Sequence, residues 1–354
     1  MDNGQMKNKL TPFKIASIYV GTIVGAGFAS GQEILQFFGF HGRSGVWGLL
    51  LSTALFIIFG TITFILGHRL NAQSHQEVVR HAAGLWLGTV IDLIITFFLL
   101  GAFSAMCAGA GAVFNEQFGI SVVWGSLAMA GISIVTVLLG IQGVLSVIGF
   151  VAPFLITAVL TISVLILTRE PVNWTWAQPH RAAISFWPLS AVTYASYNMV
   201  MSIAVLAATG ALAAERDLRK GAFWGGLSLG VGALSIQLAI RTQVPGIIGY
   251  EVPMLLLVQK ILGRFAPLYS IVLLAEVYTT AAGSLYGFAA RIINPRENRF
   301  SPMVIAAGIV GFGGSLLGFS ELVNKLYSAV GLAGIVLLVA LGRWCWKNRA
   351  FKSG

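Results

Sequence analysis

Ten apolar stretches, each about as long as a membrane-crossing helix, run through the 354-residue chain. About 20 apolar helical residues cross a hydrocarbon core roughly 30 Å thick. Windows of this kind lie at 13–39, 45–67, 87–114, 120–140, 143–167, 185–213, 221–241, 265–290, 302–319 and 322–345. Only 10% of the residues are charged, against about 25% in soluble domains. The sequence therefore predicts an all-α integral membrane protein with ten transmembrane helices, in one domain over residues 1–354.

The basic residues are unevenly distributed between the two sides of these spans. Lysines and arginines concentrate near 7–14, 69–80, 216–220, 291–299 and 343–352. If the ten spans alternate in direction, all five segments lie on the amino-terminal side of the membrane. Cytoplasmic loops of membrane proteins carry such an excess. We therefore expect both termini in the cytoplasm, and the net charge of +10 indicates topology and no nucleic-acid partner.

Ten spans divide into five and five, and five is an odd number. If the second half repeats the first, it must enter the membrane from the opposite side. Such inverted repeats are typical of secondary transporters, whose binding sites form at the midplane where matching helices are broken. Repeat one would cover about 13–167 and repeat two about 185–345. Spans one and six are then expected to be discontinuous.

Span one carries a break in its sequence, GTIVGAGFASGQE at 21–33. Gly25, Ala26 and Gly27 would supply non-helical backbone, which glycine adopts without steric penalty. Ser30 and Glu33 match the S-x-x-E capping box that starts a helix, each side chain accepting from the other's backbone N–H. We interpret Glu33 first as this cap, and a proton-carrying role is the alternative. Span one is thus predicted to be half-helix, break, half-helix.

The predicted break offers groups of both polarities at the centre of the membrane. The start of the second half-helix presents free N–H groups and the positive end of a dipole, which suit a carboxylate. The carbonyls at the end of the first half-helix, near Gly21 and Val24, suit a hard cation such as Na⁺. A site that offers N–H groups to an anion and carbonyl groups to a cation favours a zwitterionic ligand.

Span six contains polar residues at its centre, within PLSAVTYASYNMVMSIAVL at 188–206. These residues predict the second broken helix of the inverted repeat. Hydrogen bonding between neighbouring helices is the alternative explanation for them. The polar residues are Thr193, Tyr194, Ser196, Tyr197 and Asn198.

The stretch GTIVGAGFASGQEI at 21–34 resembles the first helix of the YkvI-type bacterial membrane proteins. These in turn resemble members of the amino acid–polyamine–organocation transporter superfamily, with its LeuT-type five-plus-five inverted-repeat fold. The resemblance implies an ion-coupled symporter of a small amino acid or related zwitterion, working by alternating access in the bacterial cytoplasmic (inner) membrane. Its implied partners are a small-molecule substrate and the lipid bilayer. No obligate protein partner is expected, and no cofactor beyond the coupling ion.

The resemblance to sodium-coupled members also implies roles for individual residues. Backbone carbonyls of Gly21, Val24 and Glu276, with the hydroxyls of Thr279 and Thr280 in AEVYTTAAGS, would bind one Na⁺.

In the same way the amides of Ala26 and Gly27 would bind the substrate carboxylate. Phe28 stands where two-sodium members have an asparagine, so a second sodium is not expected. Together with the polar and aromatic candidates of spans one, three and six, the predicted substrate site comprises Gly25, Ala26, Gly27, Phe28, Phe97, Tyr194, Ser196, Tyr197 and Asn198.

Glu276 is a carboxylate within a predicted span, and such groups are functional hypotheses by default. It supplies a competing hypothesis of proton coupling, in which Glu276 is protonated during the return step. Structural alternatives are an ion pair with Lys325 or hydrogen bonding within a polar core. Span five, 143–167, contains no lysine that could replace a sodium ion, which favours a real ion.

Other functional classes are less well supported by the sequence. We find no H-E-x-x-H, G-x-S-x-G or Walker motif, so no enzyme is predicted. A membrane receptor that binds a small molecule without transporting it is the main alternative. A channel is a weaker third possibility, because no ring of pore-lining charges is evident.

Overall fold

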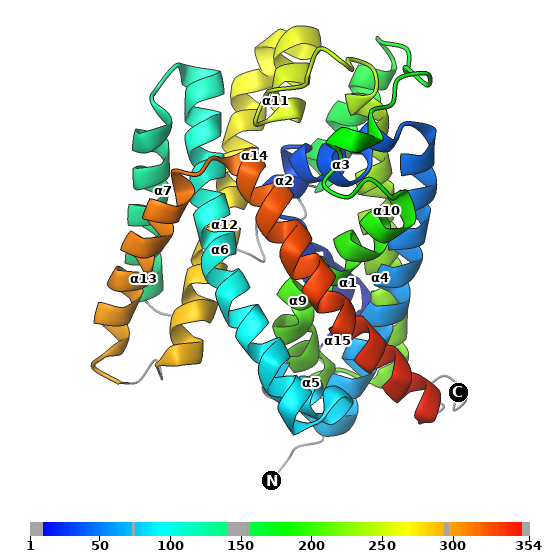
Figure 1. Ribbon diagram of the computed structural model, residues 1–354, viewed down its shortest axis with the longest axis vertical. Coiled ribbons are helices and arrows are strands. Elements are labelled where there is room, and N and C mark those ends of the chain that lie inside the picture. Colours follow the sequence, from blue (N-terminus) through cyan, green and yellow to red (C-terminus); the bar gives the residue numbers. More distant parts are fainter. Residues whose placement is uncertain (1–9, 73–74, 140–153, 155, 294–296, 349–354) are drawn as a thin grey trace.

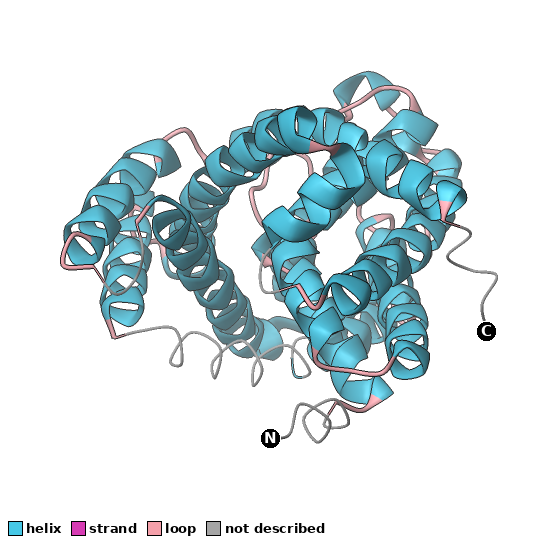
Figure 2. Cartoon of the chain, turned by 90° about the horizontal axis from the view of Figure 1, so that it is seen from below, coloured by secondary structure: helices cyan, strands magenta, loops and turns pink. Residues whose placement is uncertain are grey.

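The computed structural model describes residues 10–72, 75–139, 154, 156–293 and 297–348, which form helices joined by loops and contain no strand (Figures 1 and 2). The main helices are α1 (Pro12–Ile23), α2 (Ala26–Ala29), α3 (Gln32–Phe37), α4 (Arg43–Leu70), α5 (His75–Ala83), α6 (Leu85–Phe118), α7 (Val122–Leu138), α9 (Trp187–Ala211), α10 (Glu215–Ile240), α11 (Pro253–Leu257), α12 (Ala266–Ile292), α13 (Phe300–Ser315), α14 (Phe319–Glu321) and α15 (Ser328–Lys347). Short 3-10 helices lie at η2 (Gly39–His41), η3 (Pro179–Arg181) and η5 (Gly263–Phe265), and π-helical segments at η4 (Val258–Leu262) and η6 (Leu322–Tyr327).

Five helical stretches are each long and apolar enough to cross a membrane. They are Arg43–Leu70, Leu85–Phe118, Glu215–Ile240, Pro253–Ile292 and Phe319–Lys347. The two halves of α9 make a sixth if they form one bent span, and shorter apolar helices lie at Val122–Leu138, Ile156–Leu167 and Phe300–Ser315. Residues 143–153 of the predicted fifth span lie outside the described residues. The chain is a multi-pass membrane protein.

The long helices form two packed groups (Figure 1). Helices α1, α4, α9 and α10 pack on one another and make the first, which we call the α1 group. Helices α6, α7, α12 and α13 make the second, the α6 group. Helix α15 runs obliquely across the front in Figure 1 and contacts α9, α4 and α6, so it packs against both groups.

Glycines bring the backbones of α4 and α9 into direct contact. A Cβ atom on Gly67 would lie 2.3 Å from the carbonyl oxygen of Ala207, and one on Gly210 would lie 2.3 Å from that of Phe64. Small residues allow such close approach between membrane helices. The carboxyl-terminal part of α9 is therefore fixed to α4.

The bend of α9 lies beyond the polar residues that predicted it. The helix turns through 55° between Ile203 and Val205, whereas residues 193–198 are regularly helical. The Asn198 side chain donates to the Tyr194 carbonyl one turn earlier, 2.9 Å away. Because this polar group bonds to its own helix, it does not interrupt it. The prediction of a break at 193–198 is wrong in position.

Candidate functional site

The first span is broken near its middle, as its glycines predict. Helix α1 ends at Ile23, and Val24 has extended backbone with ψ of 113°. One turn, α2, follows, and Gly31 then takes the left-handed φ of 78° before α3 begins at Gln32. A side chain on Gly31 would also lie 2.8 Å from Cγ of Met254, so this position requires glycine.

Neighbouring elements satisfy the carbonyl groups of the break. The Ser30 hydroxyl donates to the Gly27 carbonyl at 3.1 Å, and the Tyr269 hydroxyl of α12 donates to that of Ala29 at 2.5 Å. The Met254 N–H of α11 donates to the Ser30 carbonyl at 2.9 Å. Irregular backbone at membrane depth is tolerated where the protein itself supplies such partners.

The predicted capping box does not form. The N-cap of α3 is Gly31, and the Ser30 hydroxyl accepts from the N–H of Gln32 at 3.2 Å. The left-handed Gly31 starts the helix one residue later than the capping box requires, so the Glu33 side chain is not placed to reach back to Ser30. Its carboxylate instead accepts a hydrogen bond from the Tyr197 hydroxyl of α9.

Glu33 is buried and bonds to Tyr197, which belongs to a group of packed aromatic rings. Its side chain is 4% exposed, and its Oε1 atom lies 2.0 Å from where a Cβ on Gly27 would stand. We call the carboxylate and the surrounding rings the Glu33 cluster; it comprises Glu33, Phe37, Phe98, Tyr194, Tyr197 and Tyr327. All five rings are buried.

Phe97 does not line this site, and its prediction as a pocket residue is wrong. Its side chain is 73% exposed on the surface of α6. Consecutive helical residues point about 100° apart, and the inward position belongs to Phe98, whose ring centroid lies 5.4 Å from that of Tyr327. The buried series Ile91, Ile95 and Phe98 has helical spacing, which is the signal in the sequence that indicates Phe98.

Two other predicted site residues are buried but face neighbouring helices. The Phe28 ring lies against α10, where a Cβ on Gly232 would come within 3.2 Å of it. The Ser196 hydroxyl lies against α15, where a Cβ on Gly334 would come within 2.6 Å. Tyr327 of η6 was missed by sequence reasoning, since nothing in its local sequence relates it to spans one and six.

Thr280 of the expected cation site lies where α12 passes the break. The Thr280 hydroxyl is 3.4 Å from where a Cβ on Gly25 would stand, so α12 and the break are in contact here. The Thr279 hydroxyl donates to the Glu276 carbonyl at 2.8 Å. The Val20 carbonyl still accepts from the Val24 N–H at 2.8 Å. Because α1 ends at Ile23, however, no backbone N–H four positions on bonds to the Gly21 carbonyl among the described residues.

The Glu276 carboxylate is buried at 1% exposure in α12. Lys325, the ion-pair partner considered for it, lies 2.7 Å from Glu321 on the exposed surface of the protein. That alternative is excluded. Among the described residues no cation forms an ion pair with Glu276.

A second charged network lies between α5, α6 and α12. The Arg291 guanidinium donates to both carboxylate oxygens of Asp92, with Nε at 2.9 and 3.0 Å, and His75 lies 2.9 Å from the same group. Asp92 is 3% exposed. This network joins two helices of the α6 group to the short helix α5.

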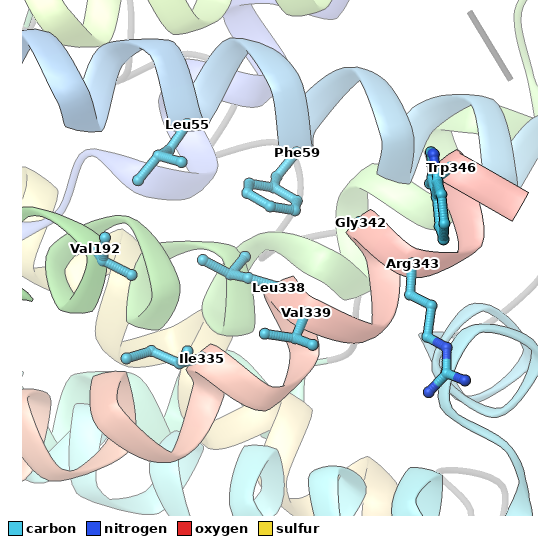
Figure 3. Close-up of a pocket in the computed structure, with 9 residues that line it drawn as sticks. All are labelled: Leu55, Phe59, Val192, Ile335, Leu338, Val339, Gly342, Arg343 and Trp346. Atoms are coloured by element: carbon cyan, nitrogen blue, oxygen red, sulfur yellow. The ribbon is translucent and has the colours of Figure 1, made fainter. Parts of the chain in front are cut away.

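An open groove of about 730 Å³ runs along α4, α9 and α15 (Figure 3). Leu55, Phe59, Val192, Ile335 and Val339 give it an apolar surface, and Arg343 and Trp346 lie at one end. None of the residues predicted to bind substrate or cation lines it. It is a side groove of the helix bundle, separate from the break in span one.

Comparisons with known proteins give the family and the fold. No model of a known protein family matches the chain. It is 32% identical over 340 residues to the membrane protein YkvI of Bacillus subtilis (strain 168), covering 95% of this chain and 96% of that protein. It is 25% identical over 327 residues to YyaD of the same organism, covering 92% and 94%.

Among solved structures, the chain resembles several transporters. MhsT in complex with L-phenylalanine has a TM-score of 0.67 at 15% identity over 93% of this chain and 88% of that one. A nucleobase-cation-symport-1 family transporter bound to bromovinylhydantoin scores 0.65 at 15% identity over 97% and 80%. A Na⁺-coupled sialic acid symporter scores 0.63 at 12% identity over 93% and 79%. These likenesses establish a LeuT-type fold, and the close relative establishes that the chain belongs to the YkvI family of bacterial membrane proteins.

Proposed function

We propose that the protein is a sodium-coupled secondary transporter that moves a small molecule bearing an amino group across the bacterial cytoplasmic membrane. The observation that carries the proposal is the contact between the break in span one and Thr280 of α12. The end of α1 beside the Thr280 hydroxyl, with Thr279 next to it in α12, would provide oxygen ligands, which a hard cation prefers. The small amino acid or zwitterion implied by the sequence is the first substrate class to test.

The packing of the helices supports an inverted repeat and alternating access. Helices α1 and α4 come from the first half of the chain, and α9 and α10 from the second, yet all four form the α1 group. The α6 group likewise takes two helices from each half. This pairing is expected when two five-helix repeats enter the membrane from opposite sides, and rocking of one group against the other would expose the site alternately. The distribution of basic residues supports cytoplasmic termini.

The solved neighbours support coupling to a cation. One is a Na⁺-coupled symporter and another belongs to a nucleobase-cation symport family. Three backbone carbonyls and two hydroxyls would give about five oxygen ligands, a number close to that found for hard cations.

Sodium coupling predicts a specific loss in Thr280→Ala. Uptake into vesicles should follow an imposed sodium gradient in the parent protein. Removing the hydroxyl should raise the sodium concentration needed for half-maximal uptake about tenfold, because one of roughly five ligands is lost. Uptake measured against sodium concentration at fixed pH tests this, with Thr89→Ala as the matched control, since Thr89 bonds only to its own helix on an exposed surface.

The competing hypotheses give different results in the same vesicles. One alternative outcome is uptake that is independent of sodium, follows an imposed pH gradient and is lost in Glu276→Gln. That result would contradict the sodium site and support proton coupling through Glu276. Ligand binding without counterflow exchange would favour a non-transporting receptor and remove the transport proposal.

A further inference from the structure

A carboxylate of the protein lies beside the position expected to receive a substrate carboxylate. The resemblance to sodium-coupled transporters implies a ligand carboxylate at the amides of Ala26 and Gly27. Oε1 of Glu33 lies 2.0 Å from the Cβ position of Gly27, and its Cγ and Cδ atoms lie 2.5 Å from it. Glu33 therefore places a negative group beside the break, and its charge opposes the binding of a second carboxylate there.

Glu33 has no counter-charge among the described residues. Its carboxylate accepts from Tyr197, and the ion pairs found among the described residues involve Asp92, Glu215 and Glu321. Burying a carboxylate without a cation is costly, and an ion pair with good hydrogen bonds offsets that cost. A ligand carrying an ammonium group would supply both.

The rings around Glu33 suit the same kind of ligand. Phe37, Phe98, Tyr194, Tyr197 and Tyr327 lie with neighbouring centroids 5.0 to 6.2 Å apart. Aromatic faces attract organic cations, and aromatic cages are a common means of binding ammonium groups. The fully buried Tyr194 hydroxyl has no hydrogen-bond partner among the described residues, so one polar group of the cluster is unused.

One wall of the cluster belongs to a segment with irregular helical geometry. Tyr327 ends η6, the π-helical segment Leu322–Tyr327 that leads into α15. Single π-helical turns inside α-helices occur frequently at functional sites. The rings now touch one another, so a ligand would enter by separating Tyr327 from Tyr197 and Phe98.

From these observations we propose that Glu33 and its aromatic cluster bind the ammonium group of an organic amine, and that the substrate carries no free carboxylate beside it. The inference rests on the proposed function and specifies its substrate class. An α-amino acid would bring its carboxylate within a few ångströms of Glu33, and like charges at that separation oppose binding.

Matched pairs of ligands test the inference on the purified full-length protein. Phenylethylamine against phenylalanine, and isoamylamine against leucine, differ only by the carboxylate. We expect the amines to raise the melting temperature and bind at least tenfold more tightly than their amino acids. Glu33→Gln should weaken amine binding about tenfold or more, equivalent to about 1.4 kcal/mol. Tyr197→Phe, which keeps the ring and removes the hydroxyl, should weaken it less.

Glu321→Gln is the control, since it removes an acid from a pair 2.7 Å apart whose side chains are 58% and 80% exposed, whereas Glu33 is buried. If Glu33→Gln does not fold, the comparison of each amine with its amino acid still tests the inference, because it needs only the parent protein. Amino acids binding as tightly as their amines, or unchanged amine affinity in Glu33→Gln, would overturn the inference. Counterflow measurements distinguish this inference from the proposed function. If amines bind but are not exchanged across the membrane, only the transport proposal is contradicted. If amino acids are exchanged and amines are not preferred, only the amine site is contradicted.

Discussion

Gly27→Ala is expected to weaken substrate binding about 10- to 100-fold while the protein still inserts into the membrane. The added Cβ would stand 2.0 Å from Oε1 of Glu33 and 2.5 Å from its Cγ and Cδ atoms. Glu33 must then move and lose its bond to Tyr197. Hydrogen bonds to charged groups contribute about 1.5–3 kcal/mol, so we expect affinity to fall by about 10- to 100-fold. Ligand-induced shifts in melting temperature measure this directly.

Gly131→Ala is the matched control for this substitution. Gly131 is in the middle of α7, and nothing lies within 4 Å of its Cβ position. Alanine there should leave binding unchanged and stabilise the helix by about 0.5–1 kcal/mol. Undiminished affinity in Gly27→Ala would show that the ligand binds away from the break.

Asp92→Asn is expected to produce a large loss of stability. Asp92 is 3% exposed and is shared by Arg291 and His75, so neutralising it leaves two basic groups without their common partner. Breaking a buried pair costs about 3–5 kcal/mol. Because the Arg291 side chain is 35% exposed and can be partly rehydrated, we expect about 2–3 kcal/mol. The measurement is the unfolding of the detergent-solubilised protein.

The exposed Glu321–Lys325 pair provides the comparison. Its side chains are 58% and 80% exposed, so Glu321→Gln should change stability by less than about 0.5 kcal/mol. Adding Arg291→Gln to Asp92→Asn should cost less than the sum of the two single changes, because the second change removes the unpaired charge. Equal losses in Asp92→Asn and Glu321→Gln would mean that the buried network contributes nothing specific.

Hydrophobicity and glycine chemistry predict the framework of this protein well. Apolar windows locate the long helices because every membrane-crossing segment must satisfy the same length requirement. The break after Ile23 follows from the glycines at 25 and 27, whose effect is local.

The details that escaped prediction depend on neighbours or on single dihedral angles. The start of α3 is set by the positive φ of Gly31, which shifts Glu33 by one position and turns a predicted cap into part of an aromatic cluster. The bend of α9 contains no glycine or proline at 203–205 to predict it. Predicting that Phe98, and not Phe97, faces the site requires the orientation of α6 about its own axis, which the neighbouring helices determine.

The cluster around Glu33 draws its parts from both helix groups. Tyr194 and Tyr197 belong to the α1 group through α9, and Phe98 belongs to the α6 group through α6. The affinity of any ligand held between them is thus a function of how far apart the groups stand. A ligand shifts a conformational equilibrium only by the difference between its affinities for the two arrangements. A molecule that binds one arrangement very tightly would hold the groups there and stop the cycle. The tightest ligand of this site is therefore expected to be an inhibitor, and the best substrate a compound that binds both arrangements with moderate and similar affinity.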